Sequence, residues 1–170
     1  MENAESVRKW YAVYTKSRWE KKVNRLLQEK GIESYCPLNK VYRKWSDRIK
    51  IVEEPLFKSY VFVWVSEEEK VLVRMTAGVT NFVYWLGKPA TVKDKEIETI
   101  KLFLEHYSDI EVIPVTLHPG QEIVISSGIF MGESARVENV KKNYVIVTIK
   151  SLGYQLRARL QHVDLQRTRK

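Results

Sequence analysis

The chain has 170 residues, with 29 Lys and Arg against 21 Asp and Glu and a net charge of +8. Its 44% hydrophobic and 29% charged residues exclude a low-complexity chain and provide enough apolar material for a core. The longest apolar run, 60–65, is far shorter than the roughly 20 residues that span a bilayer. Glu2 and Glu5 occupy the N-terminus, where a signal peptide would be apolar. We therefore expect a cytoplasmic protein without membrane association.

The sequence contains no pattern typical of a metal site or of a catalytic site. Cys36 is the only cysteine, so no internal disulfide is possible, and His106, His118 and His162 are too scattered for the usual zinc spacing. No Gly-rich phosphate loop is present, and no His or acid pattern marks Cys36 as a nucleophile. We expect no metal, no cofactor and no catalytic residue, so the protein is not predicted to be an enzyme.

Positive charge is concentrated near the N-terminus. The segment 8–50 contains 13 basic and four acidic residues, a net charge of +9, so the remainder of the chain carries −1. A concentrated positive field attracts polyanions and accelerates their encounter. Nucleic acid is the favoured partner, and a solvated basic face is the alternative.

The first elements follow from periodicity. Alternating aromatic and β-branched residues predict a strand over 10–15. Ser17 and Glu20 have the spacing of a capping box, and an apolar stripe follows, so we expect a helix from Ser17 to Gly31. A strand over 32–36 comes next, and then a hairpin over 41–53 that turns at 46–47.

The rest of the first domain follows the same logic. The pattern predicts a strand over 57–65, a short helix after a second capping box at 66–69, a strand over 79–84 and an amphipathic helix ending near His106. This order predicts an α+β sandwich over 1–107, an antiparallel sheet flanked by helices. A linker over 108–118 is expected next, because those residues carry neither a helical nor a strong turn pattern.

After Pro119 the hydrophobic period changes to 2. Short strands are expected at 122–126, 135–140, 145–150, 155–160 and 163–165, separated by turn residues. Five short strands predict a small SH3-like β-barrel over 119–170. Two of these runs are strongly β-branched, which favours a stable barrel over a helical form.

Several blocks, in order, carry a family resemblance. They are Trp10-Tyr-Ala-Val-Tyr-Thr with Glu20-Lys-Lys-Val, Glu54-Pro-Leu-Phe-Lys-Ser-Tyr-Val-Phe-Val, Gly78-Val-Thr-Asn-Phe-Val with Gly87-Lys-Pro, and Pro119-Gly-Gln-Glu-Ile-Val-Ile with Gly128-Ile-Phe-Met-Gly. The chain resembles the NusG family of transcription elongation factors over nearly its whole length. The resemblance implies an N-terminal NGN domain followed by a KOW barrel.

Two positions depart from the family pattern. Lys58-Ser59 replaces a Pro-Gly, which is more similar to the specialised RfaH-like and UpxY-like paralogues of capsular polysaccharide operons, and Ala135 replaces the last Gly of the KOW motif. The resemblance implies an operon-specific antiterminator, which binds the RNA polymerase clamp helices and the non-template DNA strand of the transcription bubble and suppresses pausing and termination. A general elongation and termination factor is one alternative, and a ribosome-associated RNA-binding module is another. We expect a monomer.

The resemblance also implies site residues. The positions matching the aromatic surface that binds the polymerase clamp are Trp10, Tyr11, Phe57, Tyr60 and Phe82. Some of these are alternatively core residues, because alternate positions of a strand face inward. We expect Phe57→Ala to weaken polymerase binding with little loss of fold.

Three further groups complete the expected surfaces. The nucleic-acid contacts expected on the first helix are Lys16, Arg18, Lys21, Lys22 and Arg25. The candidates for contact with the polymerase gate loop are Glu69, Lys70, Val71 and Leu72, where helix capping explains Glu69 equally well. The candidates for a Rho or ribosomal-protein contact on the barrel are Phe130 and Leu152, with barrel core as the alternative for Phe130.

Overall fold

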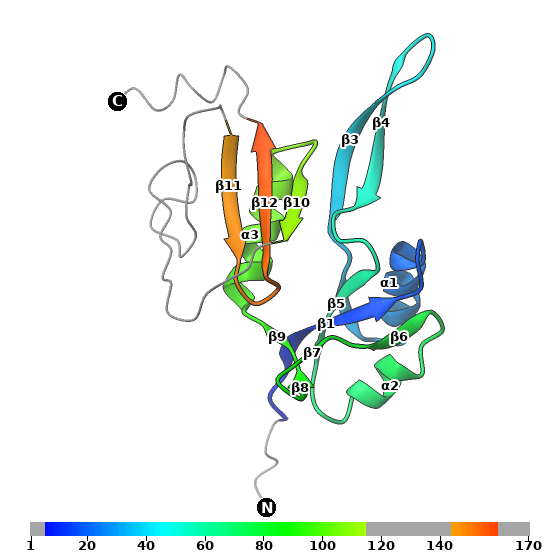
Figure 1. Ribbon diagram of the computed structural model, residues 1–170. Helices are drawn as coiled ribbons and strands as arrows, with labels where there is room; N and C mark the ends of the chain where they lie inside the picture. Colours follow the sequence, from blue (N-terminus) through cyan, green and yellow to red (C-terminus); the bar gives the residue numbers. More distant parts are fainter. Residues whose placement is uncertain (1–5, 115–143, 160–170) are drawn as a thin grey trace, which may run out of the picture. The chain divides into compact units, whose positions relative to one another are not determined.

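A computed structural model describes residues 6–114 and 144–159 of the chain (Figure 1). The chain divides into two compact units. The N-terminal unit comprises Met1–Leu38 and Pro55–Glu98, and the C-terminal unit comprises Asn39–Glu54 and Thr99–Lys170. Within the described residues, no helix has the length and apolar character needed to cross a membrane.

The N-terminal unit is built on an antiparallel sheet in the order β2-β5-β1-β6, with β9 also pairing with β1. In the central pair, Trp10 lies opposite Trp64 and Tyr14 opposite Tyr60. The strands are β1 Lys9–Thr15, β2 Glu33–Tyr35, β5 Tyr60–Val65, β6 Val79–Phe82 and β9 Thr91–Val92. A small β7–β8 pair, Tyr84–Trp85 with Lys88–Pro89, follows β6 in the chain. The strands predicted over 10–15 and 32–36 are therefore confirmed. The strand predicted over 57–65 begins only at Tyr60, and the one predicted over 79–84 ends at Phe82, with Tyr84 in the separate strand β7.

Two helices pack on one face of this sheet. Helix α1, Glu20–Glu29, buries Val23 and Leu27, and α2, Lys70–Arg74, buries Val73. The same hydrophobic cluster contains the inward residues Tyr11, Val13, Val61, Val63, Val65 and Phe82 of the strands. The apolar stripe predicted for the first helix is therefore confirmed. Burial of this stripe, rather than intrinsic propensity, supplies most of the stability of such short helices.

The two Ser-x-x-Glu patterns have different outcomes. At the second, the Ser66 N–H donates to the Glu69 carboxylate at 2.9 Å and the Glu69 N–H donates to the Ser66 hydroxyl at 3.4 Å, so the capping box forms. The expected box at Ser17 is wrong. Helix α1 begins only at Glu20, and its N-cap residue Trp19 makes no side-chain cap.

The C-terminal unit contains two groups of strands. One is a hairpin of β3, Leu38–Lys44, and β4, Ile49–Pro55, which confirms the hairpin predicted over 41–53. The other is a three-stranded antiparallel sheet in the order β10-β12-β11. These strands are β10 Glu111–Pro114, β11 Tyr144–Ile149 and β12 Tyr154–Arg159. Helix α3, Asp94–His106, runs from one unit into the other.

The second domain is described in part. Strands β11 and β12 coincide with two of the five strands expected for the barrel. The other three, at 122–126, 135–140 and 163–165, lie outside the described residues. Strand β10 falls within the segment 108–118 that was expected to be a linker, and its four residues pair with β12.

Candidate functional site

A cluster of cations surrounds the start of α1. Lys16, Arg18, Lys21, Lys22 and Arg25 are all exposed. Their backbone is held in place, because the Lys16 N–H donates to the carbonyl of Gly78 at 2.8 Å and the Trp19 N–H donates to the carbonyl of Lys16 at 3.1 Å. Arg18 has a φ of +64°, so the chain makes a tight left-handed turn between β1 and α1. The predicted nucleic-acid residues are thus brought together on one short, tethered segment.

The ammonium groups of Lys16 and Lys22 both lie over the indole ring of Trp19. Lys22 Nζ lies 4.0 Å from the centre of the ring and Lys16 Nζ lies 5.4 Å from it. The ring packs tightly on Gly78, where an added Cβ would come within 2.5 Å of a ring carbon. Trp19 therefore belongs to the apolar stripe, and its ring also positions Lys16 and Lys22 by cation–π attraction. No pattern in the local sequence reveals this second role.

Most of the cluster's charge is not neutralised. Arg25 pairs with Glu29 at 3.5 Å in a surface i, i+4 contact. Lys16, Arg18 and Lys22 make no ion pair with any described residue. Neighbouring exposed cations without acidic partners attract phosphate groups, and each phosphate bound releases counterions. The surface is therefore suited to a polyanion.

The aromatic residues predicted to contact a partner are mostly core. Trp10, Tyr11, Phe57 and Phe82 are between 1% and 7% exposed, and Tyr60 is half-buried. Phe57 packs edge-on against Phe62 with ring centres 5.7 Å apart. The expectation that Phe57→Ala leaves the fold nearly intact is wrong, because truncating a buried Phe typically costs about 3–5 kcal/mol.

Tyr14 and Tyr60 form an aromatic pair on the central strands of this sheet, with Tyr14 exposed and Tyr60 half-buried. They are directly opposite on β1 and β5, with ring centres 5.0 Å apart, and Tyr14 is 39% exposed. Strand alternation places them on the face opposite Val13 and Val61, which pack under the helices. Tyr14 was not among the predicted contact residues, because it shares its face of the strand with the buried Ala12, and alternation alone does not show that the end of this face is exposed.

The four candidates at the start of α2 fall into two pairs. The Glu69 carboxylate binds Arg8 at 2.7 Å, and Lys70 is buried with its ammonium 4.3 Å from the Tyr11 ring and 2.6 Å from Glu67. The hydrogen bond from the Ser66 N–H, and then the Arg8 guanidinium, hold the pKa of Glu69 below its ordinary value. These two side chains therefore join β1 to α2.

The other pair on α2 is available to a partner. Val71 and Leu72 are exposed, and Met75, one turn beyond Val71, is 72% exposed. Val71 and Leu72 on this short helix and Met75 at its C-cap form a small apolar patch suited to a protein contact. Met75 was not among the predicted residues, although the i, i+4 spacing from Val71 indicates it.

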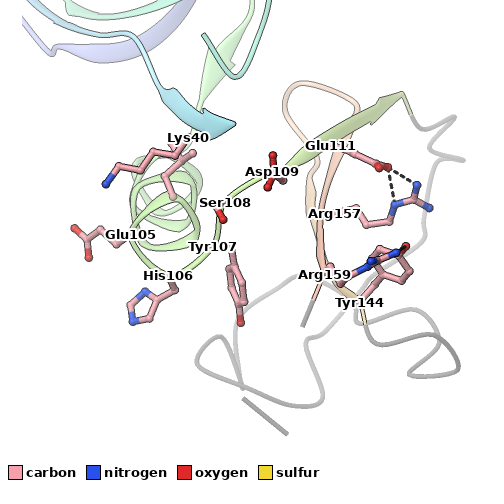
Figure 2. Close-up of a pocket in the computed structure, with 11 residues that line it drawn as sticks. Lys40, Glu105, His106, Tyr107, Ser108, Asp109, Glu111, Tyr144, Arg157 and Arg159 are labelled. Atoms are coloured by element: carbon pink, nitrogen blue, oxygen red, sulfur yellow. Dashed lines mark hydrogen bonds and ion pairs between the residues drawn. The ribbon is translucent and has the colours of Figure 1, made fainter. Parts of the chain in front are cut away.

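The C-terminal unit contains an open polar cleft of about 660 Å³, shown in Figure 2. Its two guanidinium groups are already engaged: Arg157 pairs with Glu111, and Arg159 contacts the hydroxyl of Tyr144. The Tyr144 hydroxyl raises the pKa of Arg159 further. The charge of Arg157 is therefore paired with a carboxylate, whereas Arg159 stays charged and exposed beside Tyr144. Of the two barrel candidates, Leu152 is half-buried in the turn between β11 and β12, and Phe130 lies outside the described residues.

Cys36 is a core residue of the N-terminal unit. Burial, and to a lesser extent the charge of Glu20, raises the pKa of its thiol to about 11. A thiol with this pKa carries almost no thiolate at neutral pH, so the chemistry of the site does not involve it.

Comparison with known proteins identifies the family. Residues 8–101, more than half of the chain, match the family model described as "NusG: Transcription termination factor nusG". The "Transcription termination/antitermination protein NusG" of Streptococcus pyogenes serotype M3 is 28% identical, with 89% of this chain and 92% of that protein covered. The protein of the same name from Staphylococcus aureus strain Mu50 is also 28% identical, covering 84% and 85%.

A solved structure agrees with these relatives. The structure entitled "Domain interaction in Thermotoga maritima NusG" matches with a TM-score of 0.50 and 26% identity, covering 92% of this chain and 95% of that one. Its fold supports the α+β arrangement of the N-terminal unit and the β-rich C-terminal part. The chain belongs to the NusG family.

Proposed function

We propose that this protein is a transcription elongation and antitermination factor that binds RNA polymerase together with the single-stranded DNA of the transcription bubble. The family match and the names of the relatives support this class of function. The observation that carries the nucleic-acid part is the arrangement of Lys16 and Lys22 around the fixed Trp19 ring. By holding the non-template strand, the factor would suppress pausing and early termination.

The polymerase contact is proposed on the N-terminal unit. The neighbouring rings of Tyr14 and Tyr60, tilted by 50° to each other, offer an aromatic surface, and the patch of Val71, Leu72 and Met75 offers a second apolar contact. A few desolvated side chains of this kind can dominate the binding free energy of an interface. The buried aromatic residues, such as Phe57 and Phe62, would support this surface from beneath.

An operon-specific role is proposed over a general one, because Lys58-Ser59 stands where the general family pattern has Pro-Gly. A specific factor shortens pauses only on templates with a particular non-template sequence. Equal shortening on unrelated templates would indicate a general elongation factor. The barrel is proposed to bind Rho or a ribosomal protein, with Leu152 as the described candidate.

The test is a transcription assay with purified polymerase from the same source. The wild-type factor is expected to shorten pauses, and the double variant K16E/K22E is expected to lose most of this effect while keeping its fold. The matched control is K88E/K93E, which makes the same charge change at two exposed lysines outside the cluster. A K16E/K22E variant as active as wild type would refute the nucleic-acid assignment.

Polymerase binding is measured separately with the same preparations. The variants Y60A and L72S are expected to weaken binding several-fold without loss of fold, since both side chains are at least partly exposed. A wild-type protein that does not bind polymerase would refute the elongation-factor assignment as a whole.

A further inference from the structure

We propose that the tip of the β3–β4 hairpin is a second binding site for single-stranded nucleic acid, with Trp45 as its stacking platform. Figure 1 shows this hairpin as a long two-stranded ribbon. The proposal deepens the proposed function, on which it depends for its biological setting, because a transcription bubble supplies the single strand.

The base of the hairpin is firmly fixed within its unit. The side-chain amide of Asn39 donates to the carbonyl of Ile110 at 2.8 Å and accepts the Ile110 N–H at 3.1 Å. The Asp109 carboxylate accepts the N–H of Tyr42 at 3.0 Å, and the Asp109 N–H donates to the carbonyl of Lys40 at 2.8 Å. These hydrogen bonds fix strand β3 of the hairpin to the backbone and side chain of residues 109–110.

The tip, in contrast, is fully exposed. Every residue from 42 to 51 is exposed, and the turn is closed by the N–H of Trp45 donating to the carbonyl of Arg48 at 2.8 Å. Four large apolar side chains lie within these ten residues, each at least half exposed to solvent. They are Tyr42, Trp45, Ile49 and Ile51. Such exposure on a narrow ribbon, which has no room for a core, indicates a contact surface.

The charge of the tip specifies the partner. It carries Arg43, Lys44, Arg48 and Lys50 against Asp47, a net charge of +3 within ten residues. Arg43 pairs with Glu54, whereas Lys44, Arg48 and Lys50 make no ion pair with any described residue. A partner that matches this surface electrostatically must therefore carry strong negative charge.

Aromatic residues among cations favour a single strand over a duplex. Lys50 Nζ lies 5.7 Å from the centre of the Trp45 ring, so a phosphate contact and a ring face occur side by side. In single-stranded nucleic acid, bases are free to stack on such a ring while adjacent phosphates bind the cations. In a duplex the bases are already stacked on one another, and the exposed indole gains no equivalent partner.

The experiment measures binding of the full chain to fluorescent 20-nucleotide DNA, RNA of the same sequence, and the DNA duplex, without polymerase. W45A is expected to weaken single-strand binding about tenfold, from the roughly 1–3 kcal/mol that stacking contributes per base. W45F is expected to retain most of the affinity. The triple variant K44Q/R48Q/K50Q should reduce the dependence of log K on log salt by about 2, at roughly 0.7 per phosphate on a single strand.

The matched control is Y84A/K88Q, which removes an exposed aromatic and an exposed cation outside the hairpin, and it should bind as wild type does. Single-strand affinity of W45A within twofold of wild type would overturn the proposal. Equal losses on duplex and single strand would also overturn it, because stacking on an unpaired base would not then be the contact. Comparing the DNA and RNA arms identifies which strand the site prefers.

This experiment can fail independently of the proposed function. It contains no polymerase, and the transcription assay with K16E/K22E leaves the hairpin unchanged. Loss of pause suppression in K16E/K22E with unchanged binding by W45A would keep the proposed function and reject the hairpin site.

Discussion

The buried carboxylate of Glu20, at the first position of α1, accepts a hydrogen bond from the backbone N–H of Ser59 at 2.7 Å, although 39 residues separate them. Ser59 lies just before β5, and its carbonyl in turn accepts the N–H of Thr15 at 2.9 Å. Glu20 is only 5% exposed, and its place at the helix N-terminus also suits the helix dipole. One side chain thus connects the first helix to the loop before the central strand.

We expect Glu20→Ala to lower the free energy of unfolding by about 1.5–3 kcal/mol, the typical value for a hydrogen bond to a charged group together with the unpaired N–H left behind. Urea denaturation monitored by circular dichroism measures the change. The control is Glu29→Ala on the same helix, whose surface pair with Arg25 contributes at most about 0.5 kcal/mol. Similar losses for both variants would contradict the proposed linkage.

Ser59→Gly is expected to stabilise the protein by about 1 kcal/mol. Ser59 has a φ of +63°, in the left-handed region that a side chain disfavours by roughly 1–2 kcal/mol, and Gly recovers part of that free energy after its greater chain entropy is counted. The midpoint of urea unfolding gives the result. Ser17→Gly, at an exposed position without a positive φ, should leave stability unchanged or lower it.

Gly78→Ala is expected to destabilise the N-terminal unit by at least about 2 kcal/mol. Its Cβ would lie 2.5 Å from a carbon of Trp19 and 2.8 Å from one of Val23, at a φ of +89°. The displaced indole should also weaken nucleic-acid binding, which a salt titration with labelled DNA detects. Gly87→Ala has a similar φ of +75° but open space around the Cβ, so its cost should be only about 1 kcal/mol.

The hydrogen bond from the Ser66 N–H to the Glu69 carboxylate, together with the Arg8 guanidinium, predicts an acid-dependent loss of stability. Because the folded pKa of Glu69 is lowered, its contribution is fully present above the unfolded pKa of about 4.3 and is lost as pH falls through the lower folded pKa. Glu69→Gln should therefore reduce stability at pH 7, by less than about 1 kcal/mol for this partly exposed pair, and make little difference near pH 2. Unfolding measured at both pH values tests this, and an equal effect at both would contradict it.

Local patterns predicted the elements of the N-terminal unit well. The alternation over 10–15 gave β1, and the stripe of Val23 and Leu27 gave the buried face of α1, because periodicity reports directly which side meets the core. The hairpin was predicted from its turn residues. Each of these features depends on neighbours within a few positions in the chain.

The errors all concern contacts between distant segments. Ser17 and Glu20 match the same pattern as Ser66 and Glu69, yet Glu20 binds Ser59 instead, and no local pattern contains that partner. Likewise, Phe57 and Tyr60 look equally suited to a surface, and only the packing of the sheet decides that Phe57 is buried. The basic cluster was predicted as a set, but its organisation by Trp19 depends on Gly78, almost 60 residues away.

The hairpin leaves the sheet at Pro37 and returns at Leu56, whose N–H donates to the Pro37 carbonyl at 2.8 Å. This backbone hydrogen bond joins the two ends of the hairpin, and further hydrogen bonds fix residues 39–42 to residues 109–110, so only the part beyond Tyr42 is free of such contacts among the described residues. Lengthening it should cost little, because loop entropy rises only slowly with length. Relatives could therefore lengthen or shorten the end of the hairpin beyond Tyr42 during evolution while keeping both the sheet and the hydrogen bonds at the base of the hairpin.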